Sequence, residues 1–117
     1  MVKVCLSGEI FRACRLVVDT GMHAMGWSTE KAITYLLEHS DFDRAFVTRE
    51  VSRYVTWPGQ AVSYKIGQME ILRQRKRAEN ALGDKFDIRQ FHQVVLAAAG
   101  PLHILEQQVD KFIMDSQ

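Results

Sequence analysis

The stretch RYVTWPGQAVSYKIGQMEIL, residues 53–72, contains the strongest break in an otherwise helix-forming chain. Pro58 has no backbone N–H and its ring collides with the preceding turn, so a helix that runs through Tyr54 must end before it. Proline is well suited to open a new helix, and Gly59 follows it. The stretch also places two tyrosines, an arginine and a lysine among apolar residues. Because polar groups removed from water cost free energy unless they are paired, these four side chains are functional candidates.

Apolar residues recur at helical spacing on both sides of this break, which predicts an all-α fold of five or six helices. No segment alternates at period two for long enough to indicate a strand. The first expected helix covers residues 8–22, the second is opened by Ser28, and the third extends from about Asp41 towards Trp57. The fourth covers residues 59–82 and is stopped by Gly83. The fifth follows a capping box at 87–90 and ends at Gly100, and Pro101 opens the last helix. Phe86 and Phe91 flank that box where a hydrophobic staple requires them.

Length and composition indicate one small domain, residues 1–117. The 117 residues are 47% hydrophobic and carry a net charge of +1, which gives no electrostatic argument for binding nucleic acid or a membrane surface. Cys5 and Cys14 match no metal or redox spacing, and Cys14 lies in an apolar helical pattern typical of core. No apolar run is as long as a membrane span, and the first residues do not resemble a signal peptide. We therefore expect a reducing, cytoplasmic location, although a targeting segment further upstream would change that expectation.

One helix face combines an arginine, an aspartate and a histidine. Arg15, Asp19 and His23 are spaced four residues apart, so a continuous helix stacks them in one stripe. An aspartate one turn from a histidine fixes its tautomer and favours its charged form. The simpler interpretation is a ladder of surface ion pairs, and spacing alone favours that interpretation.

Two further candidate pairs, Arg53-Tyr54 and Tyr64-Lys65, flank the Pro-Gly break. Tyrosine hydroxyls and arginine guanidinium groups suit the binding of a carboxylate or a developing oxyanion. The alternative is that both tyrosines are amphipathic core residues whose hydroxyls reach the surface.

Other polar clusters have plainer interpretations. The basic run Arg73–Arg77 spreads around its helix without interleaved aromatic residues, which favours a solvated face over nucleic-acid contact. His39, Asp41 and Asp43 resemble metal ligands, but acidic residues at a helix start act as caps without a metal. The sequence contains no HExxH, CxxC, Walker loop, GxSxG or GxGxxG motif.

Three long motifs, RLVVDTGMH (15–23), PGQAVSYKIG (58–67) and FDIRQFH (86–92), carry a family resemblance. In this order they resemble the C-terminal region of the domain-of-unknown-function 885 proteins, which are similar to zincin-type metallopeptidases. The resemblance extends from about Leu6 to Ile113, whereas residues 1–5 depart from the family pattern.

The resemblance implies a mostly helical fold whose zinc site lies upstream, in an HExxH-type helix that this chain lacks. It implies zinc for full-length members, no cofactor or metal in this chain, and a peptide as the substrate. The chain also resembles two more distant groups, and each points to a different tyrosine. The similarity to Taq-type carboxypeptidases points to Tyr64, and the similarity to angiotensin-converting enzyme points to Tyr54. We place Tyr64 first and Tyr54 second as the oxyanion donor. The expected substrate-binding residues are His23, Arg53, Lys65 and Asp19, with Asp19 orienting His23.

The leading hypothesis is therefore the substrate-facing C-terminal part of a zincin-like metallopeptidase, inactive alone, in a chain that looks like a fragment. Its expected partners are the upstream half of the domain or a second copy, with no nucleic acid or membrane. The alternative is a non-catalytic helical interaction module that kept the fold and lost the chemistry.

Overall fold

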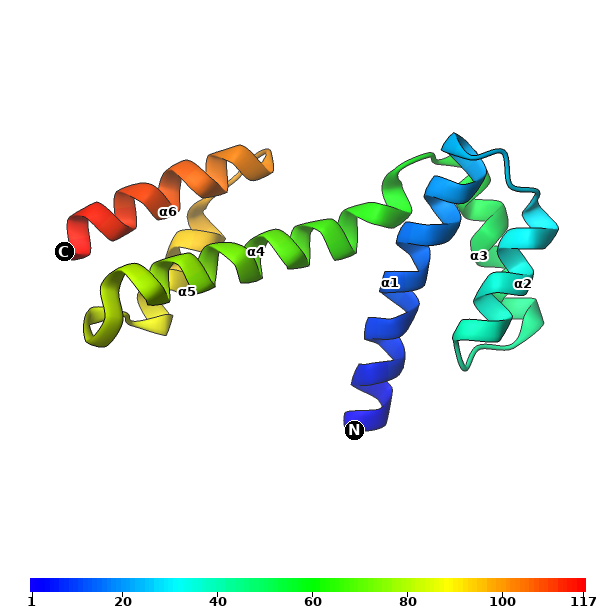
Figure 1. Ribbon diagram of the computed structural model, residues 1–117, viewed down its shortest axis with the longest axis horizontal. Helices are drawn as coiled ribbons and strands as arrows, with labels where there is room; N and C mark the ends of the chain where they lie inside the picture. Colours follow the sequence, from blue (N-terminus) through cyan, green and yellow to red (C-terminus); the bar gives the residue numbers. More distant parts are fainter. The chain divides into compact units, whose positions relative to one another are not determined.

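The computed structural model describes residues 1–117 and is helical throughout, as the sequence predicted (Figure 1). Its helices are α1 (Val2–Ala24), α2 (Thr29–His39), α3 (Arg44–Thr56), α4 (Gln60–Leu82), α5 (Ile88–Ala97) and α6 (Leu102–Ser116), with a 3-10 turn η1 (Gly83–Lys85) after α4. None of these helices combines the length and the apolar character needed to cross a membrane.

Side-chain caps set the predicted starts of two helices. The Ser28 hydroxyl accepts the Lys31 N–H at 3.1 Å and opens α2. The Asp87 carboxylate accepts the Arg89 N–H at 2.8 Å and opens α5. Each cap satisfies a backbone donor that has no partner inside the helix, which is why these two starts could be predicted from sequence.

Two other starts differ from the prediction. α1 begins at Val2 and includes Gly8, because a glycine inside a helix lowers helix stability without ending the helix. α3 begins at Arg44 rather than near Asp41. The Asp43 carboxylate accepts the Phe46 N–H at 2.8 Å, so Asp43 is the N-cap and does not lie in the first turn.

The chain divides into two compact units, residues Met1–Ile66 and Gly67–Gln117, where the sequence predicted one helical segment. In the first unit α1, α2 and α3 lie side by side (Figure 1). The apolar stripes of these helices face one another and exclude water. The buried core of this unit comprises Phe11, Cys14, Val18, Ala32, Ile33, Leu36, Val47, Val51, Tyr54 and Ala61, which confirms the core position of Cys14.

A close approach between Gly21 and Trp27 closes the turn from α1 to α2. The Trp27 N–H donates to the Gly21 carbonyl at 2.9 Å. A Cβ on Gly21 would lie 2.5 Å from Cδ2 of the indole, so any larger residue there would displace the ring. Gly21 is therefore required by packing.

The second unit packs the later part of α4 against α5 and α6. Its buried core comprises Ala78, Leu82, Phe91, Leu105, Val109, Phe112 and Ile113. The rings of Phe86 and Phe91 lie 6.0 Å apart between centroids, which confirms the predicted staple contact. α5 ends at Ala97 rather than at Gly100. Gly100 itself has a φ of +124° and directly precedes Pro101, so it lies outside helical geometry.

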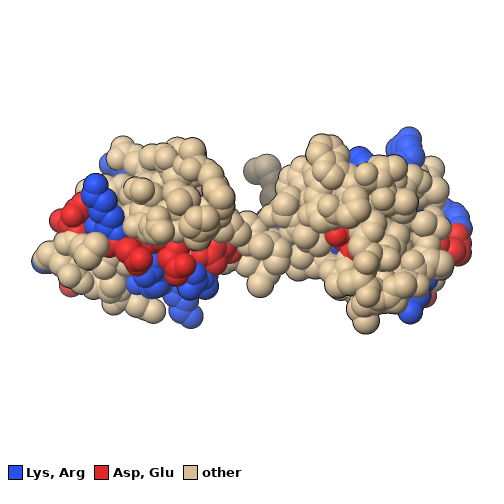
Figure 2. Space-filling view, turned by 90° about the horizontal axis from the view of Figure 1, so that it is seen from above, with Lys and Arg blue, Asp and Glu red and all other residues tan.

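The basic run of α4 is neutralised by acidic residues of its own unit. Arg73 bonds both carboxylate oxygens of Glu70 and pairs with Glu106 of α6 at 3.0 Å. Arg77 pairs with Asp110 of α6 and donates to the buried side chain of Gln74. Acidic and basic side chains accordingly lie side by side in one band on this unit, at the left of Figure 2. Two of the positive charges of the run, Arg73 and Arg77, thus pair α4 with α6, whereas Arg75 pairs with Glu79 inside α4.

We expect the second unit to lose stability as the pH falls from about 5 to 2. Hydrogen bonds from Arg73 and Gln74 lower the pKa of Glu70 from 4.5 to about 2. A carboxylate whose pKa is lowered on folding stabilises the folded state above its unfolded pKa, and this contribution disappears as the pH falls through the folded pKa. We expect a loss below about 1 kcal/mol, because Arg73 is largely solvated.

Amide hydrogen exchange of residues 67–117 at several pH values measures this loss. In Glu70→Gln the exchange-derived free energy should vary less with pH over the same window than in the unmodified protein. Identical pH dependence in both proteins would show that Glu70 does not contribute.

Candidate functional site

The stripe formed by Arg15, Asp19 and His23 faces the junction between α3 and α4. Arg15 is 7% exposed and Asp19 is 4% exposed. The interpretation of these residues as a surface ladder of ion pairs is therefore wrong. Its error has a physical reason: the end of α3 and the first turn of α4 cover this face of α1, and helical spacing alone does not reveal that cover.

Asp19 and His23 fasten the junction to α1. Asp19 Oδ2 accepts the Gly59 N–H at 3.1 Å, at a glycine with φ of +82° that an L-residue adopts with strain. His23 Nε2 lies 2.9 Å from the Tyr54 carbonyl oxygen and 3.7 Å from Asp19 Oδ1. Because a carbonyl only accepts, Nε2 must carry the proton, which leaves Nδ1 as the acceptor when the ring is neutral. The structure thus brings the predicted Asp19–His23 pair together.

Tyr54 is enclosed by its neighbours. It is 1% exposed, and its hydroxyl donates to Glu50 Oε2 at 3.0 Å. Burial raises the pKa of Tyr54, so the hydroxyl stays protonated. Arg53 binds both oxygens of Glu50 and also donates to Gln60 at 2.9 Å. The hydrogen bond from Arg53 lowers the pKa of Glu50, which remains ionised.

Tyr64 is the predicted tyrosine that reaches solvent. It is 49% exposed, and its hydroxyl oxygen accepts the Gln60 amide at 3.3 Å. No protein group accepts its hydroxyl hydrogen. Its ring covers the Arg15 guanidinium, with 4.5 Å between Arg15 Cζ and the ring centroid, and the corresponding distance to Tyr54 is 5.3 Å. Arg15 therefore lies close to two tyrosine rings, one buried and one half-exposed.

Lys65 has a different main contact from the other predicted site residues. Its ammonium pairs with Glu9 of α1 at 2.9 Å. Lys65 follows Tyr64 directly and therefore points about 100° away from it around α4. The structure does not bring Lys65 into the group around Arg15.

Sequence reasoning missed Glu50 and Gln60, and it included Arg15 in the stripe without naming it as a site residue. Glu50 lies four residues before Tyr54, and Gln60 lies four before Tyr64. Side chains at this spacing meet on one helix face, so the partner of each tyrosine was detectable from the sequence. The burial of Arg15 could not be detected from the sequence. We call Arg15, Asp19, Glu50, Arg53, Tyr54, Gln60 and Tyr64 the tyrosine–arginine cluster.

No group of three or more histidine, cysteine, aspartate or glutamate side chains is placed to bind a metal ion. His39, Asp41 and Asp43 therefore do not converge on one point. The zinc that the family resemblance implies for full-length members has no matching ligand set in these residues, and no chemical step through zinc can be assigned to them.

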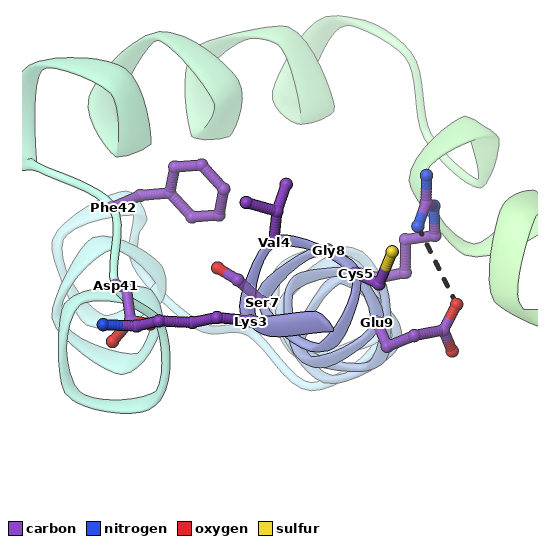
Figure 3. A pocket seen from close by; sticks show the side chains of 9 residues that line it. Lys3, Val4, Cys5, Ser7, Gly8, Glu9, Asp41 and Phe42 are labelled. Carbon is purple, nitrogen blue, oxygen red and sulfur yellow. Dashed lines mark ion pairs between the residues drawn. The ribbon is translucent and has the colours of Figure 1, made fainter. Parts of the chain in front are cut away.

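A separate open pocket of about 720 Å³ lies between the first half of α1 and the turn from α2 to α3. Val4 and Phe42 supply apolar wall (Figure 3), and Glu9 and Arg12, which form an ion pair, also line the pocket. The other lining residues are Lys3, Cys5, Ser7, Gly8 and Asp41. None of the predicted site residues lines this pocket.

Comparison with known proteins identifies the family. Residues 4–109 match the model described as "Bacterial protein of unknown function (DUF885)". The chain belongs to this family. A crystal structure described as "the putative lipoprotein from Colwellia psychrerythraea" is similar over 94% of this chain, with a TM-score of 0.92 and 45% identity. The match covers 19% of that protein, so the chain spans about a fifth of its length. No curated protein matches the chain. The predicted family is confirmed, and the cytoplasmic location stays a prediction.

Proposed function

We propose that this DUF885 chain is the substrate-facing C-terminal part of a zincin-like metallopeptidase. In this role the Tyr64 hydroxyl donates a hydrogen bond to the carbonyl oxygen of a bound peptide. The proposal is supported by the order of the three family motifs and, above all, by one geometric observation. Tyr64 combines solvent exposure with a hydroxyl hydrogen that no protein group accepts.

The surroundings of Tyr64 suit a developing negative charge. The Arg15 guanidinium lies against its ring, and the Gln60 amide donates to its hydroxyl oxygen. Preorganised positive charge and fixed donors stabilise an oxyanion most strongly where water is partly excluded. Tyr54 is less suitable for this role, because its hydroxyl already donates to Glu50 inside the core. We therefore assign the oxyanion donor to Tyr64 and a supporting role to Tyr54.

His23 and Arg53 are the other candidates for contact with the peptide. Their side chains are 28% and 39% exposed. Asp19 holds His23 in place and keeps the Gly59 turn closed. We infer that this chain alone does not hydrolyse peptides, because its residues supply hydrogen-bond donors and positive charge but no ligand set for a metal that would activate water.

We expect Tyr64→Phe to reduce peptide hydrolysis by about a hundredfold in the native product that carries this sequence, because one oxyanion donor is lost. The intact mass and the amino-acid sequence of that product are determined first, to establish whether it is longer than this chain and contains an HExxH segment. Turnover of a peptide library is then compared between the unmodified protein and the variant. Tyr35→Phe is the matched control, because Tyr35 is a partly buried tyrosine of α2 that packs on Trp27 away from Arg15.

Equal turnover in Tyr64→Phe and Tyr35→Phe would contradict the proposed role of Tyr64. A native product of this length without peptidase activity would favour the second candidate function, a helical interaction module. One observation supports that candidate. The first half of α1 exposes the apolar side chains Val2, Val4, Leu6 and Ile10, and exposed apolar patches mark interaction surfaces.

A further inference from the structure

Two nitrogens of Arg15 are buried without a hydrogen-bond partner. The side chain is 7% exposed, and both Nε and Nη2 lack an acceptor. Burying the donors of a charged group is costly unless an acceptor compensates for the lost hydration. These atoms are therefore candidates for binding a ligand that carries a hydrogen-bond acceptor.

The two nitrogens form one edge of the guanidinium, and the same chain shows what this edge binds. Arg53 uses Nε and Nη2 to hold the two oxygens of Glu50 at 3.3 and 2.8 Å. Arg73 uses the same atoms for the two oxygens of Glu70, at 2.9 and 2.8 Å. The spacing of this edge matches the two oxygens of a carboxylate. A single acceptor such as a backbone carbonyl would have to share one oxygen between both nitrogens, which gives longer and less linear hydrogen bonds.

The tyrosine rings restrict how a ligand can reach this edge. Arg15 Cζ lies 5.3 Å from the centroid of Tyr54 and 4.5 Å from that of Tyr64. Both rings therefore lie within cation–π distance of the guanidinium. Tyr54 is fully buried, whereas Tyr64 is half-exposed. Of these two rings only that of Tyr64 borders solvent, so a ligand that enters past a tyrosine must enter past Tyr64.

The two acidic side chains near Arg15, Glu50 and Asp19, accept hydrogen bonds from other residues and not from Arg15. Glu50 accepts hydrogen bonds from Arg53 and Tyr54. Asp19 Oδ2 accepts the Gly59 N–H, and Asp19 Oδ1 is buried without a hydrogen-bond partner. An acceptor with no donor thus lies one helical turn from donors with no acceptor. A ligand that carries both a carboxylate and an amide suits both groups, because its carboxylate can accept from Arg15 and its N–H can donate to Asp19 Oδ1.

We propose that the Nε–Nη2 edge of Arg15 binds a carboxylate of the ligand, with the Tyr64 ring as its movable outer cover. This inference deepens the proposed function, on which it rests for the peptide as the carrier of the carboxylate. Binding of a carboxylate to Arg15 can be measured whether or not the chain takes part in hydrolysis.

Acetate is the first probe, and the Arg15 Nε–Hε resonance of the ¹⁵N-labelled chain is the measurement. We expect a saturable shift of this resonance with acetate that chloride at equal ionic strength does not produce. Acetate binding followed at backbone amides of α1 and α4 should be at least about tenfold weaker in Arg15→Lys. Lysine keeps the positive charge but loses the paired Nε and Nη2 donors of the guanidinium. Arg12→Lys is the matched control, because Arg12 lies on the same helix with its side chain 46% exposed.

A second set of probes identifies the source of the carboxylate. Acetyl-Ala-Ala with a free carboxyl terminus, its C-terminal amide, and amidated acetyl-Ala-Asp are titrated in the same way. Tight binding of the first alone identifies a peptide carboxyl terminus, and tight binding of the third identifies an acidic side chain. Either result supports the inference.

The inference would be overturned if no carboxylate shifted the Arg15 Nε–Hε resonance and this resonance showed exchange contacts to bound water alone. That result would indicate an internal water between Arg15 and Asp19. Tyr64→Phe separates this inference from the proposed function. The phenyl ring still covers Arg15, so acetate binding should persist even where the missing hydroxyl reduces turnover about a hundredfold. Persistent acetate binding with unchanged turnover would refute the proposed function alone.

Discussion

Asp19→Ala is expected to destabilise the Met1–Ile66 unit by about 3 kcal/mol. The substitution removes the acceptor of the Gly59 N–H and the carboxylate beside His23. It also leaves the buried Arg15 charge with one less compensating carboxylate in its surroundings. Each loss leaves a polar group inside the protein without a partner, and this costs more than the loss of a solvated hydrogen bond.

Urea unfolding followed by tryptophan fluorescence measures this effect, because Trp27 and Trp57 both lie in the Met1–Ile66 unit. Asp19→Asn is the matched control. Asparagine keeps an oxygen that can accept the Gly59 N–H but loses the charge, so we expect an intermediate free energy of unfolding. A midpoint for Asp19→Ala within error of the unmodified chain would show that Asp19 does not hold the α3–α4 junction.

Much of the fold follows from local rules that the sequence displays. Ser28, Asp87 and the Pro58–Gly59 break mark helix ends through their own backbone chemistry, and the structure has ends there. The division into two units was not predicted. Ala61 joins one core and Ala78 the other, although both lie on the same helix α4. Periodicity identifies an apolar face but does not show which helices cover it.

The candidate site shows the same limit. Spacing placed Arg15, Asp19 and His23 on one face, and that prediction is confirmed. Whether that face lies in water depends on residues about 40 positions later, as the bond from Gly59 to Asp19 shows. The approach of Trp27 to Gly21 was equally hidden, since it depends on the path of the turn after α1. A cluster assembled from distant segments needs the tertiary structure to be recognised.

Phe91→Ala is expected to destabilise the Gly67–Gln117 unit by about 4 kcal/mol. Phe91 is 1% exposed in the core of this unit, so truncation removes buried apolar surface and leaves a cavity. Leu96→Ala is the matched control on the same helix, because Leu96 is 86% exposed and its loss should change stability by less than about 0.5 kcal/mol.

The distribution of aromatic residues makes the Phe91 experiment selective. All tryptophans and tyrosines of the chain precede residue 67, so the Gly67–Gln117 unit contains neither. In Phe91→Ala, helical circular dichroism and amide protection of residues 67–117 should decrease at urea concentrations where the fluorescence of the first unit is unchanged. If the two signals fell together, the units would unfold as one cooperative body. The shared helix α4 would then transmit the loss of one core to the other, and the stability assigned to Asp19 would belong to the whole chain.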